Sequence, residues 1–108
     1  MGLMNAGEGA PTVRDNTEAR RFEALADGEP AGFAEYQRSP GLVVYPHTEV
    51  RPEFEGRGVG GSLARAALED ARSRGLRALV LCPFMAGWLR RHPEYRDVAM
   101  DSRPRPRG

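Results

Sequence analysis

The sequence contains no lysine, a single cysteine and no apolar run long enough to cross a membrane. All 16 basic residues are arginine, which we interpret as a coding bias, as in a GC-rich bacterium. The lone Cys82 excludes an internal disulfide and favours a reducing compartment. The first residues lack the basic-then-apolar form of a signal peptide. A formal net charge of +1 argues against nucleic acid or a membrane as the main partner, so we expect a cytoplasmic protein.

The length of 108 residues is that of one domain. Residues 1–12 are small, polar and glycine-rich, and we expect a disordered lead-in. Residues 101–108 alternate arginine and proline and should form a tail that cannot pack. The folded domain is therefore expected over residues 13–100.

Alternation, turn residues and helical periodicity predict an α/β domain with a mainly antiparallel sheet and the order β-β-β-α-β-α. Pro46 should interrupt the third strand before the segment His47–Val50. The first helix should join two parallel strands by a crossover. The expected strands are 20–26, 29–37, 42–45, 76–82 and, as a short last strand, 94–100; the expected helices are 59–74, ended by Gly75, and 84–91.

Within the first helix, residues at three- and four-residue steps predict the buried stripe. These are Val59, Leu63, Ala66, Ala67 and Ala71, with Leu68 at the edge. The pairs Arg65–Glu69 and Asp70–Arg74 are spaced for ion pairs on the exposed side. In the second helix, we expect Phe84 and Trp88 to point into the core.

The most informative stretch is the turn Glu55–Ser62, which has four glycines in six positions. Glycine permits positive φ and leaves backbone N–H groups uncovered. At a helix start, such groups add to the positive end of the helix dipole and can bind phosphate. The alternative is a tight turn that only packs the helix on the sheet.

Three phosphate-binding motifs compete for this turn. A Walker loop requires lysine followed by serine or threonine after the last glycine, and here Gly61 precedes Ser62-Leu63. The dinucleotide pattern G-x-G-x-x-G is met by Gly56, Gly58 and Gly61, but no carboxylate follows at the end of the next strand to bind a ribose. The remaining candidate is the loop Q/R-x-x-G-x-G/A of acyl-CoA-dependent acetyltransferases.

Four short motifs support this third candidate: His47-Thr48-Glu49-Val50, Gly56-Arg57-Gly58-Val59-Gly60, Cys82-Pro83-Phe84 and His92-Pro93-Glu94-Tyr95. Together, in this order and spacing, they resemble the GNAT superfamily of N-acetyltransferases, and more closely its small single-domain branch. The resemblance spans residues 13–98. It implies a minimal GNAT fold that binds acetyl-CoA or coenzyme A.

The resemblance also implies which residues hold the cofactor. They are Val50, Arg57, Gly58, Val59, Gly60, Gly61 and Ser62. Glu55 stands where the superfamily usually has glutamine or arginine, so the backbone N–H groups from Arg57 to Ser62 must do most of the binding. The Arg57 side chain is a second source of positive charge.

By the same resemblance, the thioester lies between the segments 47–50 and 79–82, near His47, Glu49 and Cys82. His47 is a candidate general base, and its alternative is a structural histidine bonded to a carbonyl. Glu49 is a second candidate base or a solvated strand residue. Cys82 either faces the substrate or is a small buried apolar residue. Tyr95 is a weaker candidate acid.

The expected function is transfer of an acetyl group from acetyl-CoA to a primary amine, on a small molecule or a protein. The alternative is a module of the same fold that holds CoA or an acyl-CoA without turnover. We expect no metal, and a monomer or a weak homodimer. The sequence leaves the acceptor amine open.

Overall fold

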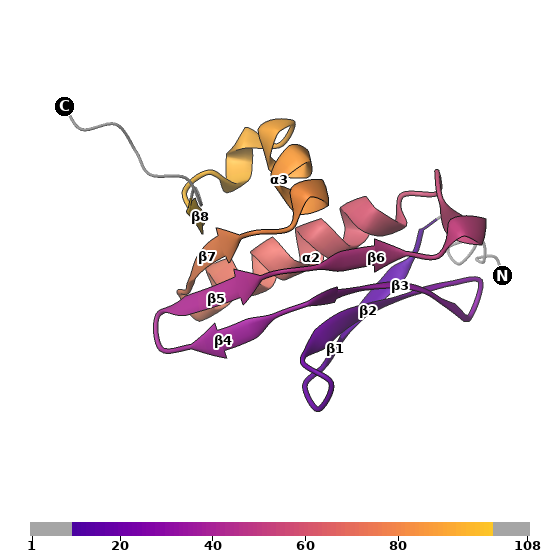
Figure 1. Ribbon diagram of the computed structural model, residues 1–108, viewed down its shortest axis with the longest axis horizontal. Coiled ribbons are helices and arrows are strands. Elements are labelled where there is room, and N and C mark those ends of the chain that lie inside the picture. The colour runs from indigo at the N-terminus through magenta and orange to yellow at the C-terminus, as the bar shows by residue number, and fades with distance from the viewer. Residues whose placement is uncertain (1–9, 101–108) are drawn as a thin grey trace, which may run out of the picture.

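The computed structural model describes residues 10–100 (Figure 1). One long helix lies along strands that form two adjoining sheets, and a shorter helix lies beside the long one. The strands are β1 (Thr12–Asn16), β2 (Arg21–Ala26), β3 (Glu29–Glu35), β4 (Gln37–Ser39), β5 (Leu42–Tyr45), β6 (Thr48–Val50), β7 (Arg77–Val80) and β8 (Ala99–Met100). The helices are α2 (Val59–Arg74) and α3 (Pro83–Arg90), with 3-10 turns η1 (Pro52–Phe54) and η2 (Pro93–Tyr95).

A long bent hairpin connects the two sheets. Its first arm is β3 followed by β4, and its second arm is β5 followed by β6. The arms break near Tyr36 and at Pro46-His47, so β3 pairs with β6 in one sheet and β4 pairs with β5 in the other. The sheet orders are β1-β2-β3-β6 and β4-β5-β7-β8. The predicted interruption at Pro46 is confirmed, because proline cannot donate a ladder hydrogen bond.

The crossover β5–α2–β7 is parallel, as the sequence predicted, and it leaves β6 at an edge. Strand β7 pairs with β5 over its four residues and has no pairing with β6. Beyond β7, the N–H groups of Leu81 and Cys82 both donate to the carbonyl oxygen of Tyr45. The two neighbouring segments therefore separate after Tyr45. The segment that leads into β6 continues beside β3, and the segment after β7 turns into α3.

The helix α2 has the predicted bounds, with Gly75 in the left-handed conformation at its C-terminal cap. Its buried face is wider than predicted, because Ala64 and Leu68 are fully buried while Ala66 is half-buried. The reason is that α2 contacts β2 and β3 on one side and α3 on another. A helix between two partners must bury more than a single stripe.

A close approach at Gly32 sets how α2 lies on the sheet. A Cβ atom placed there would lie 2.5 Å from the carbonyl oxygen of Glu49 and 3.2 Å from Cγ1 of Val59. No side chain fits in this space without displacing backbone. Gly32 therefore lets the first turn of α2 rest directly against β3 and β6.

Three predicted details differ in the structure, two of them at α3 and one on the exposed side of α2. Helix α3 begins at Pro83, whose fixed φ suits the first helical position. Trp88 is buried as expected, but Phe84 is 42% exposed and is not part of the core. The ion pair Arg65–Glu69 does not form, because the Tyr95 hydroxyl lies between them: it donates to Glu69 (2.6 Å) and accepts from Arg65 (3.1 Å).

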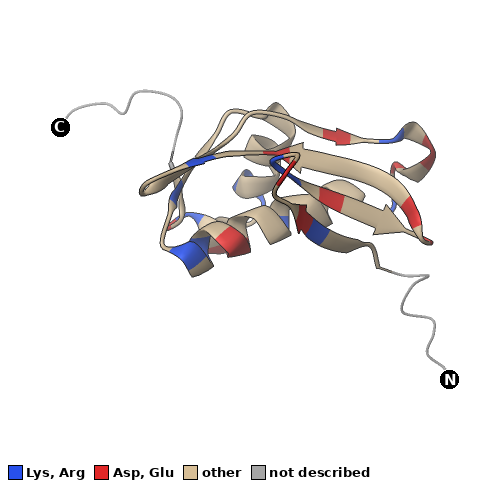
Figure 2. Ribbon diagram, turned by 90° about the horizontal axis from the view of Figure 1, so that it is seen from below, with Lys and Arg blue, Asp and Glu red and all other residues tan. Residues whose placement is uncertain are grey.

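Strand β1 begins at Thr12, inside the predicted lead-in, and completes the sheet with a segment that the sequence left unassigned. The remainder of the predicted lead-in and the predicted tail lie outside the described residues. Acidic and basic positions are interspersed along the strands and helices (Figure 2). Within residues 10–100, no helix is both long enough and apolar enough to span a membrane.

Candidate functional site

The glycine turn leads into α2 with two residues in the left-handed conformation. Gly56 has φ 83° and Gly58, the N-cap of the helix, has φ 81°. An L side chain at Gly58 would be strained even though the space around it is open. The N-cap residue therefore has no side chain with which to satisfy the helix N–H groups.

The first N–H groups of α2 are left without acceptors. The first helical hydrogen bond runs from Ser62 N–H to the carbonyl oxygen of Gly58, at 3.0 Å. Among the described residues, no acceptor is found for the N–H groups of Val59, Gly60 and Gly61. No acidic side chain stands in the first turn to neutralise the helix dipole. The turn thus presents three donors and partial positive charge to whatever lies in front of it.

A pocket of about 410 Å³ lies at this helix end. Strand β6, η1, the glycine turn, the first residues of α2 and Phe84 of α3 line it. Its lining residues are Thr48, Val50, Phe54, Glu55, Gly56, Gly58, Val59, Gly60, Gly61 and Phe84. The exposed Phe84 ring lies against Gly60, where an added Cβ would come within 2.5 Å of it. Phe84 is therefore a wall of this pocket, which explains why it leaves the core.

Strand β6 turns unsatisfied polar groups toward the same pocket. Glu35 N–H donates to His47 O and Arg51 N–H donates to Ala31 O, so the backbone groups of the two residues that flank β6 face β3. Because alternate residues of a strand direct their backbone groups oppositely, those of Thr48 and Val50 face the unpaired edge. In addition, Thr48 Oγ1 is buried and has no hydrogen-bond partner among the described residues.

Thr48 was not among the site residues predicted from the sequence. Val50 of the same strand was among them, and the period-two alternation places Thr48 on the same face as Val50. That alternation was the available signal. An unpartnered buried hydroxyl costs free energy, and such groups in native proteins usually have a reason. Here the reason is consistent with a polar ligand in the pocket.

The two charged side chains of the turn differ in position. Glu55 lines the pocket and is exposed. Arg57 is outside the lining: its guanidinium pairs with Asp27 at 2.9 Å and lies 5.2 Å from the Phe54 ring centroid. Ser62 is also outside the lining residues. Of the predicted cofactor-binding residues, Val50, Val59 and the glycines therefore line the pocket together. Arg57 and Ser62 are not among its lining residues.

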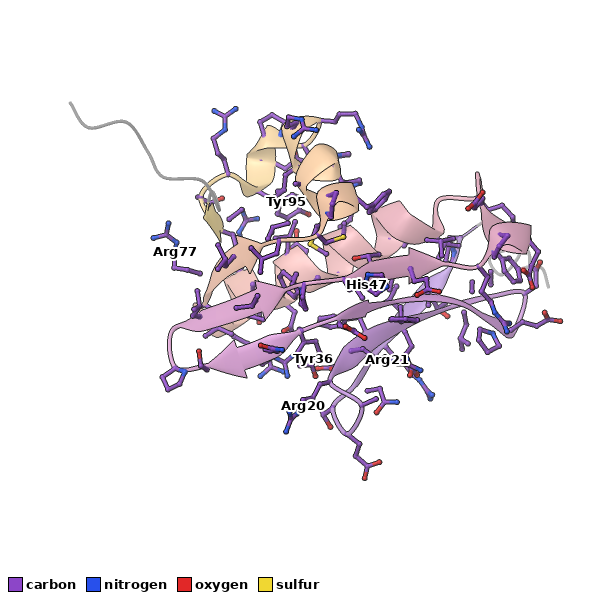
Figure 3. All side chains as sticks on the ribbon, viewed as in Figure 1. Arg20, Arg21, Tyr36, His47, Arg77 and Tyr95 are labelled. Carbon is purple, nitrogen blue, oxygen red and sulfur yellow. The ribbon has the colours of Figure 1, made fainter. Side chains whose placement is uncertain are left out.

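His47 and Glu49 lie on the other face of β6. His47 Nε2 is 3.0 Å from Glu49 Oε1, and both side chains are more than half exposed. The His47 ring also lies 5.9 Å from the Phe33 ring, centroid to centroid. In Figure 3, His47 is at the middle of the molecule, where β5 passes into β6. The partner of His47 is thus a carboxylate rather than the carbonyl of the structural alternative.

Cys82 belongs neither to the residues that line the pocket at the start of α2 nor to the His47–Glu49 pair. It is 3% exposed and stands at the N-cap of α3. Its N–H bonds to Tyr45 O, which places its backbone beside the chain that leads into His47. The burial of Cys82 in the hydrophobic core favours the alternative that it is a small structural residue of the core. Within the described residues, no cluster of three potential metal ligands is present.

These features define an α/β protein with a hydrogen-bond-donating pocket at the start of its central helix. The sequence pattern of the family described as GCN5-related N-acetyl-transferase matches residues 21–98. This range is well over half of the chain. The protein therefore belongs to the GCN5-related N-acetyltransferase family, as the sequence motifs indicated.

Solved structures agree on the fold. A GCN5-like protein from Staphylococcus aureus aligns with a TM-score of 0.66 and 23% identity, covering 85% of this chain and 90% of its own. A ribosomal-protein-alanine N-acetyltransferase from Brucella melitensis biovar Abortus 2308 aligns with a TM-score of 0.53 and 18% identity, over 82% and 66% of the two chains. An aminoglycoside N-acetyltransferase in complex with CoA gives 0.50 and 22%, over 82% and 72%. A search of curated proteins returned no significant match.

Proposed function

We propose that this protein is an N-acetyltransferase that binds acetyl-CoA in the pocket at the start of α2 and acetylates a primary amine. The observation that carries the proposal is the set of unsatisfied donors around that pocket. The N–H groups of Val59, Gly60 and Gly61 have no acceptor among the described residues, and these three residues line a space of about 410 Å³. Thr48 lines the same space, and its buried hydroxyl also has no partner among the described residues.

Each part of the cofactor has a matching part of the pocket. The three N–H groups and the helix dipole suit the pyrophosphate, since anions are stabilised at helix starts. The unpaired edge of β6 and the Thr48 hydroxyl suit the amides of the pantetheine arm. The neighbouring aminoglycoside N-acetyltransferase was solved with CoA, which supports the same cofactor here.

Acetyl-CoA, when bound, would supply a thioester: the amine nitrogen bonds to the acetyl carbon, the carbon–sulfur bond breaks, and CoA leaves as a thiolate. The proton that the amine gives up balances the step by ending on that sulfur as the free thiol. Glu49 and His47 are proposed to hold that proton, since they form one hydrogen-bonded pair on the exposed face of β6. Thr48 and Val50 are proposed to position the cofactor on the opposite face of the same strand. Adjacent residues of one strand thus separate proton handling from cofactor binding.

The test is calorimetry of CoA and acetyl-CoA binding, followed by thiol release with a panel of amines. CoA should bind far more tightly than pantetheine, which lacks the pyrophosphate. Glu49→Gln should lower kcat with an unchanged CoA dissociation constant, because the side chain does not line the cofactor pocket. Absence of any CoA binding would contradict the proposal.

One observation favours the second candidate, a module that binds CoA without turnover. Within the described residues, no α-helix precedes α2, and the turn 17–20 joins β1 directly to β2. The outer face of the β1-β2-β3-β6 sheet is therefore left without a covering helix that would help to hold an acceptor. Tight CoA binding with no thiol release across the whole amine panel would support the module.

A further inference from the structure

A second pocket, of about 340 Å³, lies on the outer face of the β1-β2-β3-β6 sheet. Glu49 and Arg51 line it, while Thr48 and Val50 of the same strand line the cofactor pocket. Strand β6 is therefore a wall shared by the two pockets. The volume of this second pocket is within the range of small-molecule sites.

The Phe33 side chain lines this outer pocket. The strand register places Arg14, Glu23, Phe33 and Glu49 in one line across four strands. The Arg21 guanidinium lies 4.6 Å from the centroid of the Phe33 ring. An apolar ring with charged groups on its sides suits a short aliphatic ligand that carries charges at its ends.

One carboxylate of the pocket is already saturated. Glu23 accepts hydrogen bonds from Arg21 (2.8 Å), Asn16 (3.0 Å) and Arg14 (3.2 Å). The hydrogen bond from Arg21 is the main cause that lowers the pKa of Glu23, followed by the bond from Asn16. Glu23 is thus ionised and fully engaged with Arg14 and Arg21, and it offers little to a ligand.

The other two charged groups of the pocket remain available. Among the described residues, His47 is the only side-chain partner of Glu49. Arg51 donates one hydrogen bond to Pro30 O (3.1 Å) and has no carboxylate within ion-pair distance among residues 10–100. A guanidinium has five N–H donors, so most of those of Arg51 are free to bind an anion.

We propose that this pocket binds the acceptor, and that the acceptor is a small primary amine that also carries a carboxylate. The ammonium lies at Glu49 and the carboxylate at Arg51, with the carbon chain on Phe33. The role of this ligand as acetyl acceptor rests on the proposed acetyltransferase function. Binding of the ligand in this pocket does not depend on that function. Positions 49 and 51 are about 6.6 Å apart along the strand, which favours an amine and a carboxylate separated by several carbons.

The test is NMR titration of the protein, with and without CoA, using 4-aminobutanoate, n-butylamine, butanoate and glycine. The amino acid 4-aminobutanoate should bind best of the four and shift the amides of Phe33, Glu49 and Arg51. Arg51→Gln should weaken its binding about tenfold and leave n-butylamine unchanged, as expected for loss of a charged hydrogen bond. The matched control is Arg77→Gln, an exposed strand arginine at the far end of the molecule in Figure 3.

The outcomes separate this inference from the proposed function. Equal binding of 4-aminobutanoate and n-butylamine, or equal loss in the Arg51 and Arg77 variants, would overturn the inference even if CoA binds and thiol is released. Shifts confined to other parts of the molecule would also overturn it. Absence of CoA binding would overturn the proposed function, while the titration without CoA would still decide the pocket.

Discussion

The two ends of α2 differ in how their polar groups are satisfied. At the C-terminal end, Asp70 pairs with Arg74 (2.8 Å) and with Arg38 (3.0 Å), and Arg38 also pairs with Asp15 (2.8 Å). The Tyr36 hydroxyl donates to Asp15 at 2.5 Å. This network ties β1, the long hairpin and the helix together, and each member has a partner.

At the N-terminal end, the same helix has three glycines, no capping side chain and no acidic residue in its first turn. Its N–H groups and the nearby Thr48 hydroxyl have no partners among the described residues. The contrast indicates that one end holds the fold together and the other is kept open for a ligand. Four substitutions test this division.

The largest effect is expected for Gly58→Asp. A carboxylate placed at the helix start would repel a pyrophosphate and bond the N–H groups itself, and we expect CoA binding to weaken on the order of 100-fold. The matched control is Gly75→Asp, which also places aspartate at a left-handed residue, with φ 70° at the other end of α2. Both variants should lose about 1 kcal/mol of stability. Calorimetry should show weaker CoA binding for Gly58→Asp alone; equal weakening in both variants would move the site elsewhere.

Asp15→Asn should affect stability and leave the ligand site intact. The variant loses charged hydrogen bonds to Arg38 and Tyr36, and we expect the free energy of unfolding to fall by about 1–3 kcal/mol at neutral pH. CoA affinity should be unchanged. A loss of CoA affinity comparable to that of Gly58→Asp would contradict the division between the two ends.

The pH dependence of the same variant follows from the ionisation of Asp15. Burial raises the pKa of this carboxyl, but the hydrogen bonds from Arg38 and Tyr36 outweigh it and hold the pKa below its ordinary value of 3.8. The ionised form is thus favoured by folding, so its contribution is present above that value and is lost as pH falls through the lower, folded pKa. Urea unfolding between pH 7 and pH 3 should show a smaller loss of stability for Asp15→Asn than for the wild type.

Thr48→Val should stabilise the protein and weaken the binding of the cofactor. Replacing an unpartnered buried hydroxyl by a methyl group of similar shape removes a desolvation cost, and we expect a gain of about 1 kcal/mol in the free energy of unfolding. CoA affinity should fall by roughly fivefold, the loss of one hydrogen bond. Thr12→Val, at an exposed position of β1, is the control. A destabilised Thr48→Val variant would show that the hydroxyl has a structural partner.

The smallest effect is expected for Arg57→Gln. Because Asp27 holds the guanidinium at 2.9 Å, outside the pocket lining, CoA affinity should change by less than about twofold. Calorimetry on this variant beside Gly58→Asp compares the side chain with the backbone of the same turn. A loss of tenfold or more would show that Arg57 leaves Asp27 to bind the ligand.

Much of the fold followed from local patterns in the sequence. The bounds of α2, its cap at Gly75 and the interruption at Pro46 depend on residues close together in the chain. The parallel pairing of β5 with β7 joins distant segments and followed from the general rule for a strand–helix–strand crossover. The errors concern tertiary partners. Phe84 was expected in the core because it is apolar, yet its ring lies against Gly60 at the start of α2 and forms a wall of the pocket. Arg65 and Glu69 have the spacing of an ion pair, but Tyr95, 26 positions after Glu69, takes both partners.

The predicted site residues also lie together only in part. Val50 and the glycines line one pocket as a group, while His47 and Glu49 pair on the opposite face of β6. Cys82 was chosen for its place at a strand end, and the structure buries it beside neither group. Its role at the thioester remains a prediction. Thr48 was missed because a threonine in a strand carries no local sign of lacking a partner.

The sequence by itself determined the glycine turn, the long helix that follows it and the family to which the motifs belong. These properties depend on conformational preferences and periodicity within a few consecutive residues. Only the tertiary structure decided that β6 leaves β7 and keeps an open edge, that one face of β6 holds Thr48 and the other the His47–Glu49 pair, and that Arg51 has no carboxylate partner among the described residues. Those properties depend on which distant segments pack together, because a polar group is free or satisfied only in relation to its neighbours in space.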